Sequence, residues 1–435
     1  MPELNRRVFL TTSFAASAAG RVLGANDRIN VAVIGLRGRG RDHMTNFSQV
    51  PNSRVAAICD IDTAQIERAR QLLGTLGSPA PQVYTDMRRL LENKDIDAVS
   101  IATPNHWHAL ATIWACQAGK DVYVEKPASH NIWEGRRAVE AARKYNRMVQ
   151  CGMQARSLEH YRRAIELVRG GGIGKVYMAK NLCYKRRQSI GRKPDGAVPA
   201  GVDYNLWLGP AAQRPFNPNR FHYNWHWFWD TGDGDIGTQG VHEMDIARWG
   251  LGKSAPAQKV SSQGGKYVYD DDQETPNTQL SAFQYGDCDQ VSQVRGLITG
   301  SEGNMMLEDD AHYIGVIFFG SQGYLTVDCN GFQVFQGEKR ELTQHVKYAE
   351  PERWSTRPHI ENFLKAVRSR QRGDLNCDIL EGHISAAMCH TANTAYRLGR
   401  TLSFDPEAEN YGSDAEANRM LTRDYRAPFT VPAKV

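Results

Sequence analysis

The stretch INVAVIGLRGRG occupies residues 29–40 and combines two features that decide the fold of the segment around it. INVAVI is a short apolar run rich in β-branched residues, as in a strand buried within a parallel sheet. GLRGRG follows it directly as a glycine-rich turn. Such a turn between a strand and a helix lets backbone N–H groups and the helix dipole approach a pyrophosphate. We therefore expect the first strand, turn and helix of a dinucleotide-binding fold.

A carboxylate at the end of the next apolar run supports this interpretation. The run VAAICD ends on Asp60, twenty positions after Gly40, where an acid binds the ribose hydroxyls of adenosine. The turn departs from G-x-G-x-x-G, because Arg37 holds the place of the second glycine and Gly38 follows it. No Lys or Arg comes directly after Asp60, and Asp62 adds negative charge that would repel a 2′-phosphate. The pattern favours NAD over NADP.

Two later strand-like runs extend the same pattern. AVSIA occupies residues 98–102 and DVYV occupies residues 121–124, with a segment of helical spacing between them. Strands that alternate with helices form a doubly wound parallel sheet, the Rossmann arrangement. We therefore expect an α/β dinucleotide-binding domain over residues 27–150.

Polar residues follow both of these runs, and ligands bind at the carboxyl ends of such strands. TPNHWH occupies residues 103–108 and EKP occupies residues 125–127. His106 and His108 form a His-x-His pair that could suggest a metal site. Two imidazoles without a third ligand nearby are more often hydrogen-bonded loop residues, so we predict no metal site.

The glycine-rich turn, Asp60, the TPNHWH stretch and the EKP triplet together resemble the Gfo/Idh/MocA oxidoreductases. The resemblance implies that an α+β domain, here residues 151–410, follows the first domain. Its open, mainly antiparallel sheet carries a sugar or polyol site and often the oligomer interface, so a homodimer or homotetramer is implied. The tail, residues 411–435, is expected to pack back on the first domain.

The turn and the resemblance together identify the residues expected to hold the cofactor. These are Gly35, Gly38, Arg39, Gly40, Asp60, Thr103, Asn105, His108, Glu125, Lys126 and Gln154. The resemblance also implies that Lys126 lies beside the nicotinamide and the hydroxyl being oxidised. A partly desolvated lysine near a cation has its charged form disfavoured, so it can accept or relay the hydroxyl proton.

The other expected catalytic residues are His242, Glu243 and Asp245. Relatives commonly carry D-x-x-x-H-x-x-D on a helix that faces the nicotinamide, and His242 and Asp245 match it three positions apart, on one helical face. Thr238 stands in the place of the first acid. Glu243 supplies a carboxylate, but adjacent helical residues diverge by about 100°, so it need not face the same ligand.

An aromatic segment over residues 184–229 is expected to contribute to the substrate site. Its centre, NRFHYNWHWFW at 219–229, could be a packed structural corner or a sugar site, since sugar C–H faces stack on indoles while hydroxyls take hydrogen bonds. The expected substrate contacts are Arg156, His222, Trp225 and His226.

Composition excludes several other classes of protein. The 53 Lys and Arg residues exceed the 48 Asp and Glu residues by a net charge of +5 and form no long basic runs, so nothing favours nucleic-acid binding. Eight cysteines are scattered without a Cys-x-x-Cys pair, which argues against a zinc knuckle or a thioredoxin-like site. No segment beyond the N-terminus is apolar enough to suggest a membrane span.

The N-terminus suggests export. Asn5 to Leu10 is NRRVFL, an adjacent arginine pair before a short apolar stretch rich in Ala and Ser. This pattern fits a twin-arginine (Tat) signal over residues 1–26, which is read by the Tat export machinery and delivers folded proteins to the periplasm. The alternative is a disordered basic tail. An exported enzyme meets no NAD pool, so its cofactor would have to stay bound and be reoxidised in place.

Three functions are compatible with these features. The first is an exported, NAD-dependent oxidoreductase that acts on a carbohydrate hydroxyl with a tightly bound cofactor. The second is a redox-neutral glycoside-cleaving enzyme that oxidises C3, eliminates the aglycone and then reduces the product with the same NAD; Thr238 in place of the acid favours it. The third is an exported sugar-binding protein that retains NAD without catalysis, against which Lys126 argues. We predict the first.

Overall fold

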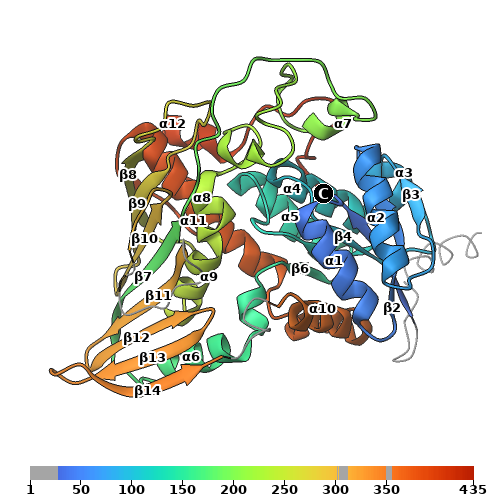
Figure 1. Cartoon of the computed structure of the whole chain (residues 1–435). Coiled ribbons are helices and arrows are strands. Elements are labelled where there is room, and N and C mark those ends of the chain that lie inside the picture. The colour runs from blue at the N-terminus through green and yellow to red at the C-terminus, as the bar shows by residue number, and fades with distance from the viewer. Residues whose placement is uncertain (1–27, 301, 303–311, 349–354) are drawn as a thin grey trace, which may run out of the picture.

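Figure 1 shows the computed structural model, which describes residues 28–300, 302, 312–348 and 355–435. The expected twin-arginine segment, residues 1–26, lies outside the described residues. A six-stranded sheet of order β3-β2-β1-β4-β5-β6 is parallel throughout. Its strands are β1 (Ile29–Ile34), β2 (Ser53–Cys59), β3 (Gln82–Tyr84), β4 (Ala98–Ile101), β5 (Asp121–Val124) and β6 (Val149–Cys151). The predicted doubly wound sheet is confirmed.

Helices cover both faces of this sheet, because successive side chains of a buried strand point to opposite faces. Val31 and Val33 of β1 pack with α1 and α2, whereas Ala32 and Ile34 pack with the helices of the other face. The helices between these strands are α1 (Gly38–Gln49), α2 (Thr63–Thr75), α3 (Met87–Leu91), α4 (Asn105–Gln117) and α5 (Ile132–Lys144).

A helix from far along the chain completes the cover of the first sheet. Helix α10 (Arg357–Ser369) lies beside α1 in Figure 1 and buries Ile360 and Phe363 against the sheet. The Phe363 ring meets the edge of Tyr123 at a centroid distance of 5.8 Å. The range 151–410, which we assigned to the second domain, therefore contains a helix that packs with the first.

The second sheet has nine strands in the order β14-β13-β12-β11-β7-β10-β9-β8-β15. Among the strands that the structure describes, β7 and β10 are the one parallel pair; the other neighbours are antiparallel, so the expected open, mainly antiparallel sheet is confirmed. The strands are β7 (Val176–Lys185), β8 (Lys259–Gly265), β9 (Thr278–Gln284), β10 (Asp289–Arg295), β11 (His312–Gly320), β12 (Gly323–Asp328), β13 (Gly331–Gln336), β14 (Glu341–Lys347) and β15 (Leu402–Ser403).

Helices on one side of the second sheet bring it to the first. Helix α11 (Ile379–Leu398) contacts α5 and β6 as well as β8, and α9 (Gly240–Gly250) packs on β7 and β11. The remaining helices are α6 (Glu159–Arg169), α7 (Tyr204–Leu208), α8 (Gly234–Thr238) and α12 (Ala415–Asn418), with 3₁₀ turns η1 (Gln154–Ser157), η2 (Asn224–Trp227), η3 (Arg372–Asp374) and η4 (Arg419–Leu421). None of the described helices is long and apolar enough to cross a membrane.

The tail returns to the first domain. The Phe429 ring packs edge-on against Trp107 of α4, and Tyr425 donates a hydrogen bond to Glu134 of α5 at 2.9 Å. One local feature differs from the sequence interpretation: α4 begins at Asn105, directly after Pro104, so His106 and His108 lie in its first turn rather than in a loop. A proline just before a helix fits this start, because its fixed φ is compatible with the entry to the first turn.

Candidate functional site

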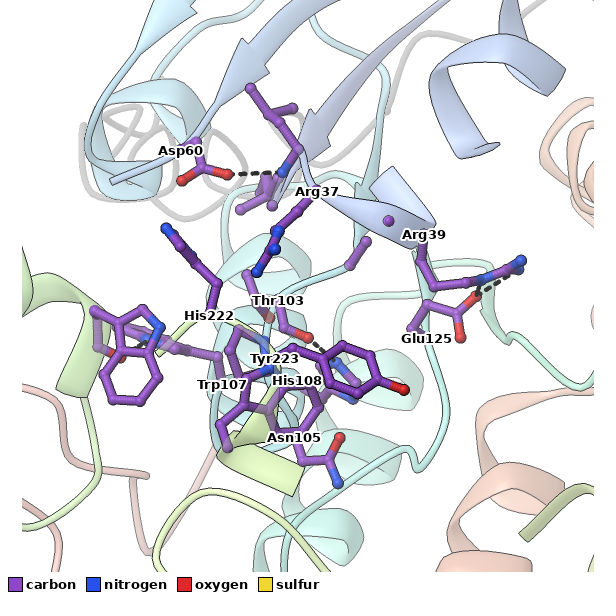
Figure 2. A pocket seen from close by; sticks show the side chains of 18 of the residues that line it. Arg37, Arg39, Asp60, Thr103, Asn105, Trp107, His108, Glu125, His222 and Tyr223 are labelled. Carbon is purple, nitrogen blue, oxygen red and sulfur yellow. Dashed lines mark hydrogen bonds and ion pairs between the residues drawn. The ribbon is translucent and has the colours of Figure 1, made fainter. Parts of the chain in front are cut away.

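A cavity of about 700 Å³ opens at the carboxyl ends of the first sheet, within the usual range for a ligand site. Figure 2 shows side chains from both domains converging on it. We name its two ends by their residues: the Asp60 end and the Lys126 end.

The glycine turn brings the backbone of the first turn of α1 close to the backbone at the end of β1. Gly35 has φ of +84°, and a Cβ on Gly40 would lie 1.9 Å from the Gly35 carbonyl oxygen. By contrast, a Cβ on Gly38 would meet nothing within 4 Å, and Gly38 lines the cavity. The first N–H groups of a helix lack partners within it and carry its positive dipole end. The turn therefore offers these donors to an anion in the cavity.

Asp60 stands at the end of β2, where the sequence placed a ribose acid. One of its carboxylate oxygens accepts the Leu36 N–H at 2.8 Å and the other accepts the Asp62 N–H at 3.0 Å. Burial raises the pKa of Asp60 to about 6. A buried carboxylate held in this way retains lone pairs for hydroxyl donors. Arg37, at the broken position of the glycine motif, also lines the cavity (Figure 2).

At the other end, Lys126 links the two domains across the cavity. Its Nζ donates to the Thr238 carbonyl oxygen at 2.5 Å. Burial lowers the pKa of Lys126; Arg39 and Lys185 lower it further, whereas Glu125 opposes them. A lowered pKa leaves more of the amine in its neutral form, and a neutral amine can accept a proton from a hydroxyl group.

Glu125, the first residue of EKP, is fully engaged by protein groups. Its Oε1 accepts from Arg39 at 2.9 and 3.1 Å and contacts His43 Nε2 at 3.0 Å, and its Oε2 accepts from the Lys126 backbone N–H at 3.3 Å. Although burial acts against ionisation, Arg39 and His43 hold the pKa of Glu125 well below its usual range. Figure 2 shows the Arg39–Glu125 pair. Glu125 therefore fixes the wall of the cavity. Gln154 lies beside this pair, where its amide oxygen accepts a hydrogen bond from Arg39 and its amide nitrogen donates to the Gly152 carbonyl.

The two histidines of α4 bind backbone carbonyls. His108 bridges the loops after β4 and β5, with Nε2 at 2.8 Å from the Thr103 carbonyl and Nδ1 at 2.7 Å from that of Pro127. His106 Nε2 lies 2.9 Å from the Trp207 carbonyl. Asn105 donates to Asp233 at 2.9 Å. Within the described residues, no group of three or more His, Cys, Asp or Glu side chains is arranged to hold a metal.

The segment 186–229, which we call the strap, runs from the second domain across the cavity to the first. Its backbone bonds to the loop after β2: Asp203 N–H donates to the Ile61 carbonyl at 2.9 Å, and Thr63 N–H to the Gly201 carbonyl at 3.0 Å. His222 Nε2 lies 2.8 Å from the carboxylate of Asp62. The strap is thus attached to the first domain beside Asp60.

The strap also places aromatic groups in the cavity. Trp225 and His226 line it with their rings stacked at a centroid distance of 3.6 Å. His226 Nδ1 donates to the Tyr223 carbonyl, and burial lowers the pKa of His226 to about 3. The imidazole is therefore neutral, with Nε2 as its proton-accepting nitrogen. Of the four expected substrate contacts, His222, Trp225 and His226 line the cavity.

The fourth, Arg156, lies outside the cavity lining and pairs with one of the expected catalytic acids. Its guanidinium holds Asp245 at 2.7 and 2.9 Å and Glu381 at 2.9 Å. Arg248 and Ser385 also bond to Asp245, which is 1% exposed. This buried network occupies both side chains, so the structure gives Arg156 and Asp245 a role in joining α9, α11 and η1.

His242 and Glu243 lie on α9 behind the lining. Burial and the positive charge of Lys126 lower the pKa of His242 to about 3, so this imidazole is neutral as well. Glu243 is fully buried and accepts a hydrogen bond from Gln239 Nε2 at 3.1 Å. Gln239 and Thr238 themselves line the cavity.

The sequence analysis did not single out several polar lining residues, among them Lys185, Arg187, Tyr223 and Gln239. Lys185 and Arg187 belong to the run YKRR at residues 184–187, where a strand ends. Basic residues at the end of a strand in the second domain are a signal that the sequence contains, but only the fold shows that this strand end faces the first domain.

Two family models match the chain, and together they span most of it. Residues 29–153 match the NAD-binding Rossmann fold of the Gfo/Idh/MocA oxidoreductases, and residues 187–431 match the C-terminal α/β domain of the same family. The chain belongs to the Gfo/Idh/MocA oxidoreductase family. Its first domain is an NAD-binding domain, as predicted.

Individual curated proteins match this chain over shorter stretches. An uncharacterized oxidoreductase, YrbE, of Bacillus subtilis is 30% identical over 153 residues, covering 35% of this chain and 43% of that protein. A glycosyl hydrolase family 109 protein of Shewanella pealeana is 34% identical over 130 residues, covering 29% of this chain and 28% of that protein. The matched stretches thus span less than half the length of these curated relatives.

Solved structures of other proteins share the fold over most of the chain. Levoglucosan dehydrogenase in complex with NADH and levoglucosan superimposes with a TM-score of 0.67 at 16% identity, covering 87% of this chain and 99% of that one. Aldose-aldose oxidoreductase from Caulobacter crescentus, complexed with glycerol, gives 0.66 at 17% identity, covering 87% and 100%.

The residues present fit NAD. The close glycine turn, the N–H groups at the start of α1 and Asp60 at the end of β2 are the kinds of group that would hold a pyrophosphate and an adenosine ribose in this fold. Gly35, Gly38, Arg39, Asp60, Thr103, Asn105, His108, Glu125 and Lys126 all line the cavity. Gly40 contributes from behind by allowing the close turn.

Proposed function

We propose that this protein is an NAD-dependent oxidoreductase that acts on a hydroxyl group of a carbohydrate and keeps its cofactor bound between turnovers. NAD, when bound, supplies the hydride acceptor. The observation that carries the proposal is Lys126: an amine with a lowered pKa, at the far end of the cavity that begins at the NAD-binding turn.

Lys126 has the geometry of a proton acceptor. The bond to the Thr238 carbonyl uses one N–H of the amine and fixes its position, and deprotonation leaves a lone pair for the substrate hydroxyl. His226, with its neutral imidazole, can accept a hydrogen bond from a second hydroxyl of the substrate. His242 lies behind the lining. Because its imidazole is neutral, it places no second positive charge beside Lys126.

The aromatic strap supports a carbohydrate as the substrate. The rings of Trp225 and Tyr223 lie among hydrogen-bonding groups, which suits the apolar faces and hydroxyl edges of a sugar ring. Solved relatives with the same fold include a levoglucosan dehydrogenase and an aldose-aldose oxidoreductase, in agreement with this class of substrate.

The strap also supports retention of the cofactor. It is attached to the first domain by backbone bonds at Ile61 and Thr63 and by the His222–Asp62 contact, all beside Asp60. Release of a dinucleotide from the Asp60 end would require some of these bonds to break. A retained cofactor suits export by a twin-arginine signal to the periplasm, which we propose from residues 1–26 and which cell fractionation of a full-length and an Arg6/Arg7-substituted chain would test.

Redox-neutral cleavage of a glycoside is the second candidate. It is favoured by the similarity of 130 residues of the chain to a glycosyl hydrolase family 109 protein and by Thr238 at the position of the acid in relatives. This reaction returns the cofactor to its starting state and needs no second sugar.

One experiment separates these functions. The mature protein is purified without added cofactor and denatured, and the released NAD and NADH are quantified; fresh protein is then incubated with glycosides and free sugars. Stoichiometric cofactor together with an oxidised and a reduced sugar supports the oxidoreductase. Free aglycone without net oxidation supports the glycosidase. Bound cofactor that no sugar or glycoside reduces contradicts both.

A further inference from the structure

The Lys126 end of the cavity has an excess of positive charge. The lining there includes Lys126, Lys185 and Arg187. Of the three lining carboxylates, Asp60 and Asp86 lie at the ends of β2 and β3, and Glu125 is engaged by Arg39 and His43. Within the described residues, none of these acids makes a direct ion pair with Lys185.

Arg187 does not contribute to this excess, because it has its own counterion. Its guanidinium holds the carboxylate of Asp235 through Nε at 3.0 Å and Nη2 at 2.6 Å, and it stacks on the Trp227 ring at 5.0 Å. A bidentate pair of this kind uses the planar donor fork that would otherwise suit a phosphate. Arg187 is therefore a neutralised part of the wall.

Lys185 remains as the positive charge that faces the cavity. It lies at the end of β7 and is half-buried. In the described part of the chain, the one hydrogen bond of its ammonium group is to Gln239 Oε1, at 3.3 Å. Gln239 in turn donates through Nε2 to Glu243 at 3.1 Å. Glu243 thus turns the amide so that its oxygen faces Lys185, which positions the ammonium without a direct ion pair.

An ammonium group has three N–H donors, and this arrangement uses one of them. The remaining donors point to a ligand that carries a single negative charge, since the Lys126 amine is held by the Thr238 carbonyl and Arg187 is neutralised by Asp235. A monoanion matches this charge better than a phosphate ester, whose second charge would find no partner. A carboxylate on the sugar is the group that fits.

We infer that Lys185 recognises a carboxylate of the substrate, so that the protein acts on a sugar acid of the uronate type in preference to the neutral sugar. This inference rests on the proposed function, which assigns the Lys126 end of the cavity to the substrate. Gln239 and Glu243 position Lys185, which makes Glu243 a positioning residue rather than a catalytic one.

The test uses matched sugars that differ at one carbon. NAD-loaded protein is titrated in a calorimeter with a methyl hexopyranosiduronate, the corresponding methyl hexopyranoside and the uronamide, each in the gluco, galacto and manno series, and with a hexose 6-phosphate. The uronamide is the sharpest control, because it keeps the planar shape of the carboxylate without its charge. In at least one series, the uronate is expected to bind about tenfold or more tightly than both neutral analogues, the strength of a good charge-assisted hydrogen bond.

Substitution of Lys185 should remove this preference without loss of the bound cofactor. Lys185→Met and Lys185→Gln are both expected to bind the uronate no better than the uronamide, with NAD content unchanged. Lys180→Met is the matched control, since Lys180 lies on the same strand and pairs with Glu302; it should retain the preference. Equal affinity of the wild-type protein for uronate and uronamide, tighter binding of the hexose phosphate, or a preference that survives both Lys185 substitutions would overturn the inference.

Absorbance of the bound cofactor, recorded in the same samples, separates this inference from the proposed function. Neutral sugars that reduce the cofactor as readily as uronates would leave the proposed function standing and refute the role of Lys185. A uronate that binds through Lys185 but never reduces the cofactor would support the role of Lys185 and refute the proposed function.

Discussion

Lys126 of the first domain donates a hydrogen bond to the carbonyl oxygen of Thr238 in the second, at 2.5 Å. This bond closes the cavity at the end opposite Asp60 and fixes the amine that we propose as the proton acceptor. The contact joins the end of β5 to α8, so the reacting end of the cavity forms only when the two domains are in place.

Removal of the Lys126 amine should abolish turnover without loss of the cofactor. Lys126→Met is expected to lower kcat about 10²- to 10⁴-fold, the range for a lost general base. NAD released on denaturation should remain stoichiometric. Lys94→Met, on the exposed surface of the same domain, is the control and should behave as wild type. Full activity of Lys126→Met on every accepted sugar would contradict the assignment.

The pH dependence of kcat/KM should follow the charges around Lys126. Because the neutral amine is the active form, the rate falls as the pH drops below the pKa of Lys126, which burial holds below its usual value. Lys185→Met removes a charge that lowers this pKa and should move the acidic limb to higher pH. Glu125→Gln removes a charge that raises it and should move the limb to lower pH. Limbs that move in the same direction would show that another group controls the rate.

Asp60→Ala should weaken NAD binding. The carboxylate ends β2 beside the glycine turn, and its loss removes the acceptor for the ribose hydroxyls. We expect roughly a tenfold or greater loss in affinity, the effect of a good pair of hydrogen bonds, measured as residual cofactor after dialysis. Asp95→Ala, an exposed acid of the same domain, should keep its NAD. Unchanged NAD content in Asp60→Ala would place the ribose elsewhere.

The His222–Asp62 contact should control how fast NAD leaves. His222→Phe keeps the ring but loses the 2.8 Å contact that attaches the strap beside Asp60. Loss of a charge-assisted bond predicts about a tenfold faster dissociation, measured by exchange of labelled NAD. His345→Phe on the exposed strand β14 is the control. Equal exchange rates in both variants would exclude the strap as a barrier to release.

Asp245 should be a stability residue. Asp245→Ala leaves Arg156 and Arg248 buried without this counterion, which is expected to cost about 3–5 kcal/mol in the free energy of unfolding. Although burial opposes it, Arg156 lowers the pKa of Asp245 to about 2 in the folded protein, from 3.8. Its stabilisation is therefore present above pH 4 and lost as the pH falls toward 2. Urea denaturation of the wild-type protein and Asp245→Ala between pH 4 and pH 2 should show that the difference in their free energies of unfolding becomes smaller as the pH falls.

Local patterns in the sequence predicted the parts of the site that depend on one strand and its following turn. Asp60 and Lys126 follow buried strands, and the carboxyl ends of parallel strands meet at one edge, so their convergence did not require tertiary information. The spacing of His242 and Asp245 predicted a shared helical side. It could not show that this side meets Arg156, because that partner is 89 residues away and on another element.

Charge at the end of a strand was the signal that we missed. Lys185 and Arg187 have no motif, and their meaning depends on which strands of the second sheet face the first domain. Equally, Phe363 lies on an amphipathic helix whose apolar face suits either sheet. Only the packed structure assigns that helix to Tyr123 and the first sheet.

The position of α10 has a consequence for synthesis of the chain. One face of the first sheet is covered in part by Ile360 and Phe363, which leave the ribosome more than 200 residues after the last strand of that sheet. Until α10 has been synthesised, buried residues of the sheet such as Tyr123 lack the side chains that pack on them in the finished protein. The core of the nucleotide domain therefore cannot be completed while the first 151 residues are the only ones outside the ribosome. A fragment cut near residue 150 would expose this face and associate through it, whereas a circularly permuted chain that begins at α10 would give the nascent domain its cover first.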